Sequence, residues 1–160
     1  MKDKARYFHH ALQPEDFSVD TQYSALQNAC NESGAIVTFT GLVRDLSKIN
    51  ASVECIELHT YPAMTQQQIQ QIGEDIFQRF DVDGISIIHR YGKLKPTEQI
   101  VLVGIASKHR VEAFSAAQMA MDFLKSQVTF WKKEHYKNGT EPKWIQPTTT
   151  DHDAVEKWLK

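Results

Sequence analysis

The stretch Glu98-Gln99-Ile100-Val101-Leu102-Val103-Gly104-Ile105-Ala106-Ser107, with the helical segment that follows it, decides the fold. Its run from Ile100 to Val103 is apolar at every position, which predicts a strand buried on both faces. From about residue 109 to residue 128, apolar side chains recur every three or four positions, which predicts an amphipathic helix. The expected apolar stripe consists of Val111, Phe114, Ala117, Met121, Leu124 and Val128. We expect this stripe to pack in the core rather than to line a cofactor site.

Further elements of the same two kinds flank this strand and helix. Periodicity and composition predict helices over residues 21–31, 62–80 and 151–159, and strands over 35–44, 53–61, 85–91 and 144–145. Helices and strands in this order predict an α+β fold with mostly antiparallel pairing.

The chain is expected to form one domain over residues 1–160, because its length suits a single core and no linker divides it. We expect the polar residues 1–16 to form a loosely ordered arm. We expect residues 129–143 to form a mobile loop, because they are polar and contain Asn138 followed by Gly139.

The composition excludes several classes of protein. Hydrophobic residues make up 41% and charged residues 24%, which is a globular composition rather than a disordered or fibrous one. The longest apolar run is far shorter than a membrane span, and no secretory signal follows Met1. Cys30 and Cys55 form no CxxC pair, so we expect neither a disulfide framework nor a structural zinc site. These features predict a cytoplasmic protein.

The net charge of −2 conceals an uneven distribution along the chain. Residues 1–107 carry a net charge of −4, whereas residues 108–143 carry +3. A basic segment inside an acidic protein indicates either a local anion site or simply a solvated face.

Most familiar catalytic motifs are missing from the chain. There is no GxGxxG, GxxxxGK[ST], HExxH or GxSxG motif. The seven histidines do not cluster at metal-ligand spacing, so no metal site is predicted. No base stands beside Cys30 or Cys55 in the sequence, and we expect both to be small core residues.

The triplet Lys108-His109-Arg110 is unusual, because it opens a predicted helix. A helix N-terminus carries partial positive charge and disfavours cations, so this arrangement predicts an anion site. The alternative is that Ser107 caps the helix and Arg110 extends into solvent.

A second basic group comprises Lys125 and the segment Phe130-Trp131-Lys132-Lys133-Glu134. Lys125 falls beside the predicted apolar stripe, where a lysine with other cations nearby suits proton transfer. Phe130 and Trp131 would exclude water or stack on a flat ligand. The alternative is a helix that ends in lysines because they complement its dipole, and spacing alone favours that reading.

Six motifs in order resemble one family. They are GAIVTFTGLVR (34–44), YPAMT (61–65), HRYG (89–92), HR (109–110), MDFLK (121–125) and FWKKE (130–134). Together they resemble the large, catalytic subunit of molybdopterin synthase, the MoaE family, over roughly residues 17–146. The resemblance implies an α/β-hammerhead fold and transfer of sulfur to cyclic pyranopterin monophosphate. The sulfur would come from the C-terminal Gly-Gly thiocarboxylate of a small ubiquitin-like subunit, within a heterotetramer built on a central homodimer.

The resemblance also implies roles for particular residues. Lys125 and Lys132 would be the catalytic lysines, with the 129–143 segment beside them. The substrate-binding residues would be Leu42, Val43, Arg44, His109, Arg110, Lys133 and Glu134. No metal and no cofactor would be needed, because the sulfur is imported. Leu42 departs from the basic residue expected in relatives, and no basic residue lies in 146–150.

Two readings from other classes stay open. The chain could be a non-catalytic module that binds a phosphate or nucleotide through residues 107–110 and the basic segment. It could also bind single-stranded nucleic acid through alternating aromatic and basic side chains. The net charge of −2 opposes nucleic-acid binding, and no membrane contact is expected.

Overall fold

The computed structural model describes residues 5–46, 52–146 and 150–160, with side chains left out at 150–152. The described elements are β1 (Tyr7–Gln13), α1 (Val19–Ala29), β2 (Ala35–Leu42), β3 (Val53–His59), α2 (Pro62–Arg79), β4 (Val82–Arg90), β5 (Gly92–Leu94), β6 (Gln99–Ser107), α3 (Arg110–Ser126), β7 (Trp131–Tyr136), β8 (Lys143–Ile145) and α4 (Thr150–Glu156). The α+β prediction is confirmed, and among these strands only the β1–β4 pair is parallel. No helix in the described ranges is long and apolar enough to cross a membrane.

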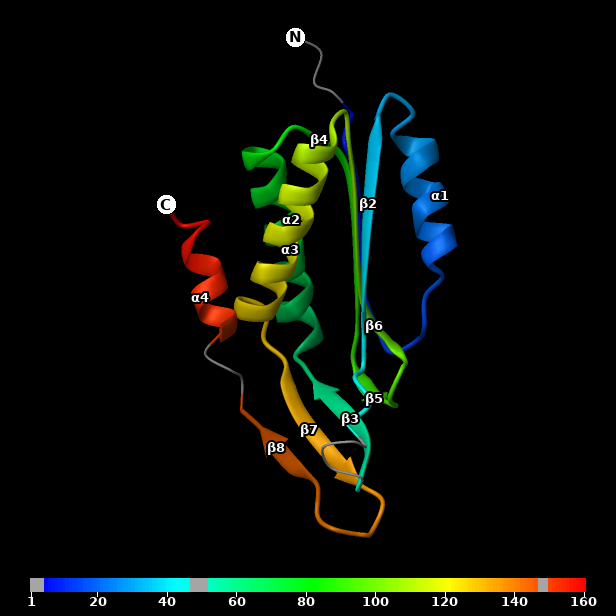
Figure 1. Ribbon diagram of the computed structural model, residues 1–160, viewed down its shortest axis with the longest axis vertical. Helices are drawn as coiled ribbons and strands as arrows, with labels where there is room; N and C mark the ends of the chain where they lie inside the picture. The colour runs from blue at the N-terminus through cyan, green and yellow to red at the C-terminus, as the bar shows by residue number, and fades with distance from the viewer. Residues whose placement is uncertain (1–4, 47–51, 147–149) are drawn as a thin grey trace.

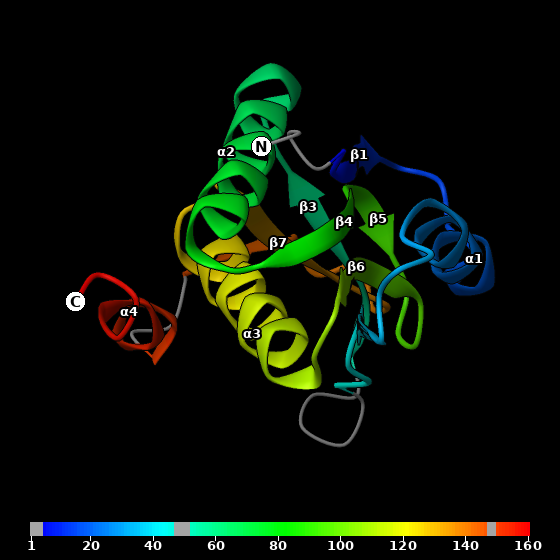
Figure 2. The same ribbon diagram turned by 90° about the horizontal axis from the view of Figure 1, so that it is seen from above.

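The first sheet has the strand order β1-β4-β6-β2 and forms the centre of the fold. Helices α2 and α3 lie side by side on one face of this sheet and α1 lies on the other (Figures 1 and 2). Both faces are therefore covered, which explains why β4 is buried at every position and β6 from Val101 onward. The expectation of a fully buried strand over residues 100–103 is confirmed apart from Ile100, which is partly exposed.

The buried face of α3 differs from the predicted stripe. Val111 is 65% exposed and Phe114 is 62% exposed, so the first two positions of that stripe are wrong, whereas Ala117 is buried as predicted. The helix instead buries small residues against the sheet, namely Ala113, Ala116, Ala117 and Ala120, before Phe123 and Leu124. Alanines let the helix approach the sheet closely, and this close packing turns the larger side chains Val111 and Phe114 outward.

Strand β1 corrects the prediction of a loosely ordered arm over residues 1–16 for its described part, and residues 1–4 lie outside the described residues. Tyr7–Gln13 pairs in parallel with β4, which satisfies the backbone polar groups along one side of the segment. Phe8 packs on α2 at Gly73, where an added Cβ would come within 2.1 Å of the ring. Pairing with a distant strand, rather than local sequence, therefore orders this segment.

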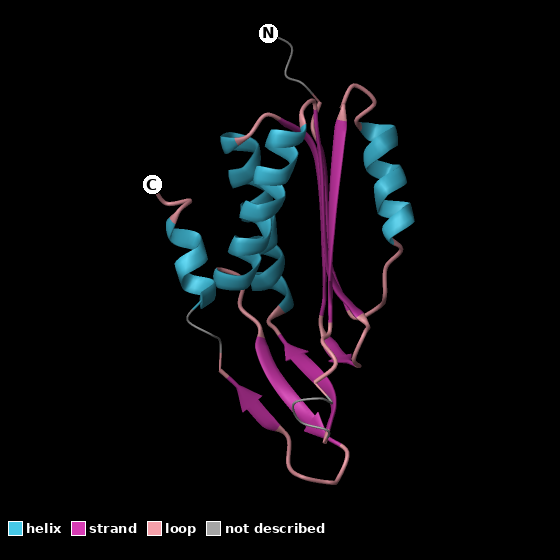
Figure 3. Ribbon diagram, viewed as in Figure 1, coloured by secondary structure: helices cyan, strands magenta, loops and turns pink. Residues whose placement is uncertain are grey.

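The second sheet has the order β5-β3-β7-β8 and lies beyond the end of the first (Figure 3). Its inner face packs on a small core of Val43, Ile56, Leu58 and Leu94. Strands β7 and β8 correct the prediction of a loop over 129–143, because Trp131–Tyr136 pairs with both β3 and β8. The polar composition of this segment indicated a loop, but backbone pairing with two neighbouring strands makes it a strand.

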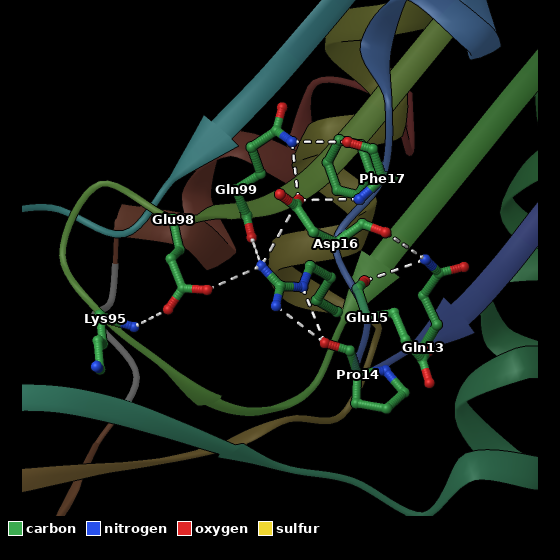
Figure 4. Close-up of polar contacts among 9 residues, drawn as sticks. Gln13, Pro14, Glu15, Asp16, Phe17, Lys95, Glu98 and Gln99 are labelled. Atoms are coloured by element: carbon green, nitrogen blue, oxygen red, sulfur yellow. Dashed lines mark hydrogen bonds and ion pairs between the residues drawn. The ribbon is translucent and has the colours of Figure 1, made fainter.

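Buried Arg90 ties the end of β4 to the N-terminal segment and to the start of β6, and its partners Pro14, Asp16, Glu98 and Gln99 are labelled in Figure 4. Its guanidinium donates to the carbonyl of Pro14 through Nε and Nη2, at 3.1 and 3.0 Å, and to the carbonyl of Gln99 at 2.9 Å. Asp16 and Glu98 lie 3.7 and 3.5 Å from the same cation. These contacts fix the ends of β4 and β6 at the point where the second sheet begins.

Candidate functional site

The two lysines predicted to be catalytic line one cavity of about 640 Å³ at the junction of α3 and the second sheet. Lys125 reaches it from the last turn of α3 and Lys132 from β7. The remaining lining residues are Ser126, Val128, Thr129, Phe130, Trp131, Trp144, Ile145 and Gln146. The structure therefore brings together two cations that are separated by a helix end and a turn in the sequence.

Lys125 is exposed in the last turn of α3. A cation at this end of a helix interacts favourably with the helix dipole, so its position costs little stability. Lys125 also lines a second cavity of about 510 Å³, between α3 and β2. Lys125 therefore borders both cavities.

The register of the second sheet determines which way Lys132 points. Lys132 lies opposite Leu58 on β3 and Ile145 on β8, and Leu58 is part of the buried core. Residues that are directly opposite one another in a sheet share a face, so Lys132 lies on the inner face toward α3.

Lys133 lies on the opposite face from Lys132. It pairs with Glu57 and Trp144, and its ammonium lies 5.0 Å from the centre of the Trp144 ring. The structure therefore does not place Lys133 beside Lys132, although its partner Trp144 lines the cavity. Glu134 is on the inner face, and its carboxylate accepts a 3.1 Å hydrogen bond from Tyr136. Partial burial and this carboxylate raise the pKa of the Tyr136 phenol.

Phe130, an aromatic residue that lines the cavity, packs against the buried side chain of His89. The His89 ring stacks on Phe130 with centroids 4.1 Å apart. Burial lowers the pKa of His89 to about 4, despite the opposing effect of its 2.8 Å hydrogen bond with the Arg90 carbonyl. His89 is therefore a structural histidine, because its ring is neutral at physiological pH and packs against Phe130, which lines the cavity.

The outer face of the second sheet carries a group that sequence reasoning missed. The Oε1 atom of Glu57 lies 3.1 Å from Nε2 of His59, and its Oε2 atom lies 2.5 Å from Nε2 of His135. Burial acts to raise the pKa of Glu57, but the two histidines outweigh it and lower the pKa. His59, Tyr61 and Trp131 line an adjoining cavity of about 350 Å³ together with Trp144. The alternation Glu57-x-His59, which places both side chains on one face of a strand, was the sequence pattern that could have indicated this group.

Strand β2 ends at Leu42, and Val43 and Arg44 follow it toward the second sheet. Leu42 and Arg44 are exposed, whereas Val43 is buried beside Ile56 and Leu58. The Val43 side chain therefore belongs to the core, and only its backbone could contact a ligand. The backbone N–H and C=O of Val43 are themselves used in hydrogen bonds with Glu98 and Thr97.

His109 and Arg110 lie at the other end of α3. His109 is the N-cap residue, and the Ser107 hydroxyl donates to its carbonyl at 2.6 Å. Lys125 lies fifteen positions after Arg110 in the same helix, a rise of about 22 Å. Within one chain, therefore, these exposed residues do not join the two lysines.

The cysteines and the other candidate ligands have no catalytic arrangement. Cys30 and Cys55 are buried free thiols, as expected for core residues. Burial, with Glu54 and Glu57 nearby, raises the pKa of Cys55, which disfavours the reactive thiolate. Among the residues that the structure describes, no group of three His, Cys, Asp or Glu side chains is placed to hold a metal ion.

The arrangement has the chemistry of an anion-binding pocket. Two lysines from different elements line one space, and Phe130, Trp131 and Trp144 line it with them. Such cations stabilise negative charge that develops during a reaction. The pattern that characterises one family, MDFLK followed by FWKKE, builds this pocket.

The sequence pattern of the MoaE protein family matches residues 12–127. The chain belongs to the MoaE family. Its similarity to the molybdopterin synthase catalytic subunit of Mesorhizobium japonicum is 41% identity over 147 residues, covering 92% of this chain and 91% of the relative. MoaE relatives of this kind therefore match nearly the whole chain rather than one motif.

Solved structures agree with this membership. The MoaE protein from Burkholderia ambifaria MC40-6 superposes with a TM-score of 0.80 at 33% identity, covering 95% of this chain and 98% of that one. A subunit from a complex of subunits 1 and 2 of the molybdopterin-converting factor of Helicobacter pylori shares the fold, with a TM-score of 0.67 at 16% identity, and the match covers 89% of this chain and 90% of that one. The MoaE fold implied by the six motifs is thus confirmed.

Proposed function

We propose that the protein is the catalytic subunit of a molybdopterin synthase and acts as a sulfurtransferase. It would transfer sulfur from the C-terminal thiocarboxylate of a small ubiquitin-like subunit to cyclic pyranopterin monophosphate, forming the dithiolene of molybdopterin. The observation that carries this proposal is the convergence of Lys125 and Lys132 on one partly aromatic cavity in a MoaE family member. The reaction would take place in the cytoplasm, where buried Cys30 and Cys55 stay reduced.

Each transfer consists of two balanced steps. The thiocarboxylate sulfur bonds to a side-chain carbon of the pterin in place of an oxygen substituent. Water then cleaves the bond between the acyl carbon and sulfur, which leaves a carboxylate on the donor subunit and a thiolate on the pterin. Two such transfers give the dithiolene, and no external oxidant or reductant is required.

The two lysines have different tasks in these steps. Lys125, at the helix end, lies by the incoming thiocarboxylate and stabilises the charge that develops on it. Lys132, on the inner face of the sheet, exchanges a proton with the pterin or orients it. Phe130 and Trp131 limit the access of water and offer surfaces for a flat ring.

The remaining predicted residues act around this centre. Arg44 and Glu134 would contact the substrate from the end of β2 and from the inner face of β7. Lys133 would act indirectly, because its ammonium holds Trp144 from the outer face. Leu42 and Val43 would shape the end of β2 rather than grip the phosphate.

His109 and Arg110 would act on the site of a second copy. One protomer cannot supply both ends of α3 to one pterin, since the two ends are about 22 Å apart. A central homodimer that sets the N-terminus of α3 against the Lys125 end of its partner would complete the pocket. The exposed apolar side chains Phe39, Val111 and Phe114 along β2 and α3 offer a surface for that contact.

The test is reconstitution of the reaction with three components. The protein is mixed with a thiocarboxylated ubiquitin-like subunit and cyclic pyranopterin monophosphate, and both products are followed by mass spectrometry. We expect dithiolene on the pterin and conversion of the donor thiocarboxylate to a carboxylate. Binding of the pterin with the thiocarboxylate left intact would instead support the non-catalytic phosphate-binding module.

A further inference from the structure

Thr129 lies in the turn that leads from α3 to β7, between the two lysines of the cavity. It is four positions after Lys125 and three before Lys132. It also lines the cavity that these lysines share. The path of the chain through Thr129 therefore sets the position of Lys132 relative to Lys125.

Gln68 of α2 binds Thr129 through both ends of its side-chain amide. Its Oε1 accepts a 3.1 Å hydrogen bond from the backbone N–H of Thr129. Its Nε2 donates to Thr129 Oγ1 at 3.4 Å, which is the longer and weaker contact. Because one planar amide makes both contacts, Gln68 fixes the orientation of Thr129 as well as its position. The two residues meet only because α2 packs beside α3.

The carbonyl of Thr129 is held by the segment that joins β3 to α2. Thr60 Oγ1 donates a 3.3 Å hydrogen bond to this carbonyl, and the same hydroxyl contacts the hydroxyl of Thr65. A hydroxyl has one proton to donate, so Thr65 must be the donor to Thr60. Thr65 is fully buried in α2, where it is a fixed anchor for this chain of hydrogen bonds. Thr60 and Gln68 together thus bind the N–H, the carbonyl and the hydroxyl of Thr129.

These contacts join the two connections that run from the helices to the second sheet. The β3–α2 connection and the α3–β7 connection lie side by side at this junction (Figure 1). Lys125 stands on the helix side of the junction and Lys132 on the sheet side. A shift of the second sheet against α3 would change the separation of the two lysines, and misplacement by about 1 Å is enough to slow catalysis severely.

We propose that Gln68 and Thr60 are positioning residues, which hold Thr129 and thereby fix Lys132 relative to Lys125. Neither residue is among the described residues that line the cavity of the two lysines, so both act through Thr129 rather than on a substrate. This inference rests on the proposed function for its effect on turnover. Its effect on the turn itself can be measured without any substrate.

The first test follows hydrogen exchange of the Thr129 backbone amide by NMR. Gln68→Ala removes both contacts with Thr129 but does not weaken α2, because alanine is the better helix former. We expect exchange at Thr129 to become at least about tenfold faster. The Tm should change by less than about 3 °C. An exchange rate equal to that of wild type would show that Gln68 does not hold the turn, and would overturn the proposal.

Gln70→Ala is the matched control on the same helix. Gln70 is exposed, and its Nε2 donates a 2.9 Å hydrogen bond to Glu74 within α2. Its replacement should leave both the exchange at Thr129 and the turnover at wild-type values. Equally faster exchange in Gln68→Ala and Gln70→Ala would indicate a general loosening of α2, and would overturn the specific role of Gln68.

Initial rates in the reconstituted sulfur-transfer reaction test the positioning role. Gln68→Ala should lower kcat about tenfold and change the KM for the pterin by less than about twofold, because the groups that contact the substrate remain but are misplaced. Thr60→Val, which loses the donor to the Thr129 carbonyl, should lower kcat about threefold. Thr60→Ser, which keeps the hydroxyl, should restore it. A higher KM with an unchanged kcat would contradict positioning.

Failure of this inference and failure of the proposed function give different results. Wild-type protein without sulfur transfer would overturn the proposed function, and exchange at Thr129 would still decide whether Gln68 holds the turn. Wild-type protein that transfers sulfur, with Gln68→Ala equally fast, would overturn the positioning role alone.

Discussion

The two sheets of this protein divide stability from chemistry. The first sheet is covered by helices on both faces, and its central strands β4 and β6 are almost wholly buried. The second sheet has a small core on one face, and β7 consists of aromatic and charged residues that are partly exposed. Both predicted catalytic lysines lie where the second sheet meets the end of α3. Substitutions in the two sheets should therefore affect different properties of the molecule.

The largest expected effect on stability is in the first sheet. Ile105→Ala removes a fully buried side chain from β6 and leaves a cavity in the main core. The free energy of unfolding should fall by about 2–5 kcal/mol, as is usual for such truncations. Urea denaturation measures this loss. A decrease of less than about 1 kcal/mol would contradict the expected division between the two sheets, because the first sheet would then not be the main source of stability.

Arg90, where the sheets meet, should rank second. Arg90→Met keeps part of the buried stem but leaves the carbonyls of Pro14 and Gln99 without their donor. We expect a loss of about 2–4 kcal/mol in the same denaturation experiment. Arg79→Met, at an exposed guanidinium, is the matched control and should cost less. Equal losses in the two variants would contradict the account of Arg90.

His89 should make stability depend on pH. The folded protein holds this histidine neutral down to a pKa of about 4, whereas in the unfolded chain it takes up a proton near pH 6.5. The unfolded state therefore binds more protons between these values, and stability falls as the pH falls from about 6.5 to 4. At pH 5, protonation of His89 in the unfolded chain lowers the free energy of unfolding by about 2 kcal/mol. Denaturation of His89→Gln at pH 7.5 and pH 5 should show a smaller difference than wild type, and an unchanged difference would contradict this assignment.

Substitutions of Lys132 and Lys133 test the two faces of β7 separately. Of the substitutions considered, they should change the stability least. Lys132→Ala should change the free energy of unfolding by less than about 0.5 kcal/mol, because the side chain is not part of the core. Sulfur transfer should nevertheless fall by about 100-fold or more, whereas Lys133→Ala should lose less, about tenfold at most. Initial rates in the reconstituted reaction measure both. Equal losses would mean that the inner face has no special role.

The same division explains which elements could be predicted from sequence. Strand β6 carries a continuous apolar run and helix α2 an apolar periodicity, so their existence and approximate bounds followed from local patterns. Strand β7 has polar residues on both faces, and its pairing with β3 over a long separation gives no local signal. Strand β1 was missed for the same reason. The register of α3 on the sheet was misjudged because alanines, rather than large residues, make the closest contact.

The site residues that lie in sequence motifs could be predicted. Those that reach the site only through strand pairing could not. Lys125 and Lys132 were assigned through the resemblance, and the structure places them on one cavity. Trp144 and Ile145 join that cavity only because β8 pairs with β7. The opposite faces of Lys132 and Lys133 likewise depend on the sheet register, and the Gln68–Thr129 contact depends on where α2 packs.

The end of α3 beside the second sheet is expected to carry the chemistry and little of the stability. The variant Lys125→Arg tests this division, because the substitution keeps the charge and changes the shape of the cation. We expect turnover in the reconstituted sulfur-transfer reaction to fall by about 100-fold or more, with Tm within about 2 °C of wild type. Unaltered turnover would contradict the catalytic role of Lys125 and with it the location of the active site.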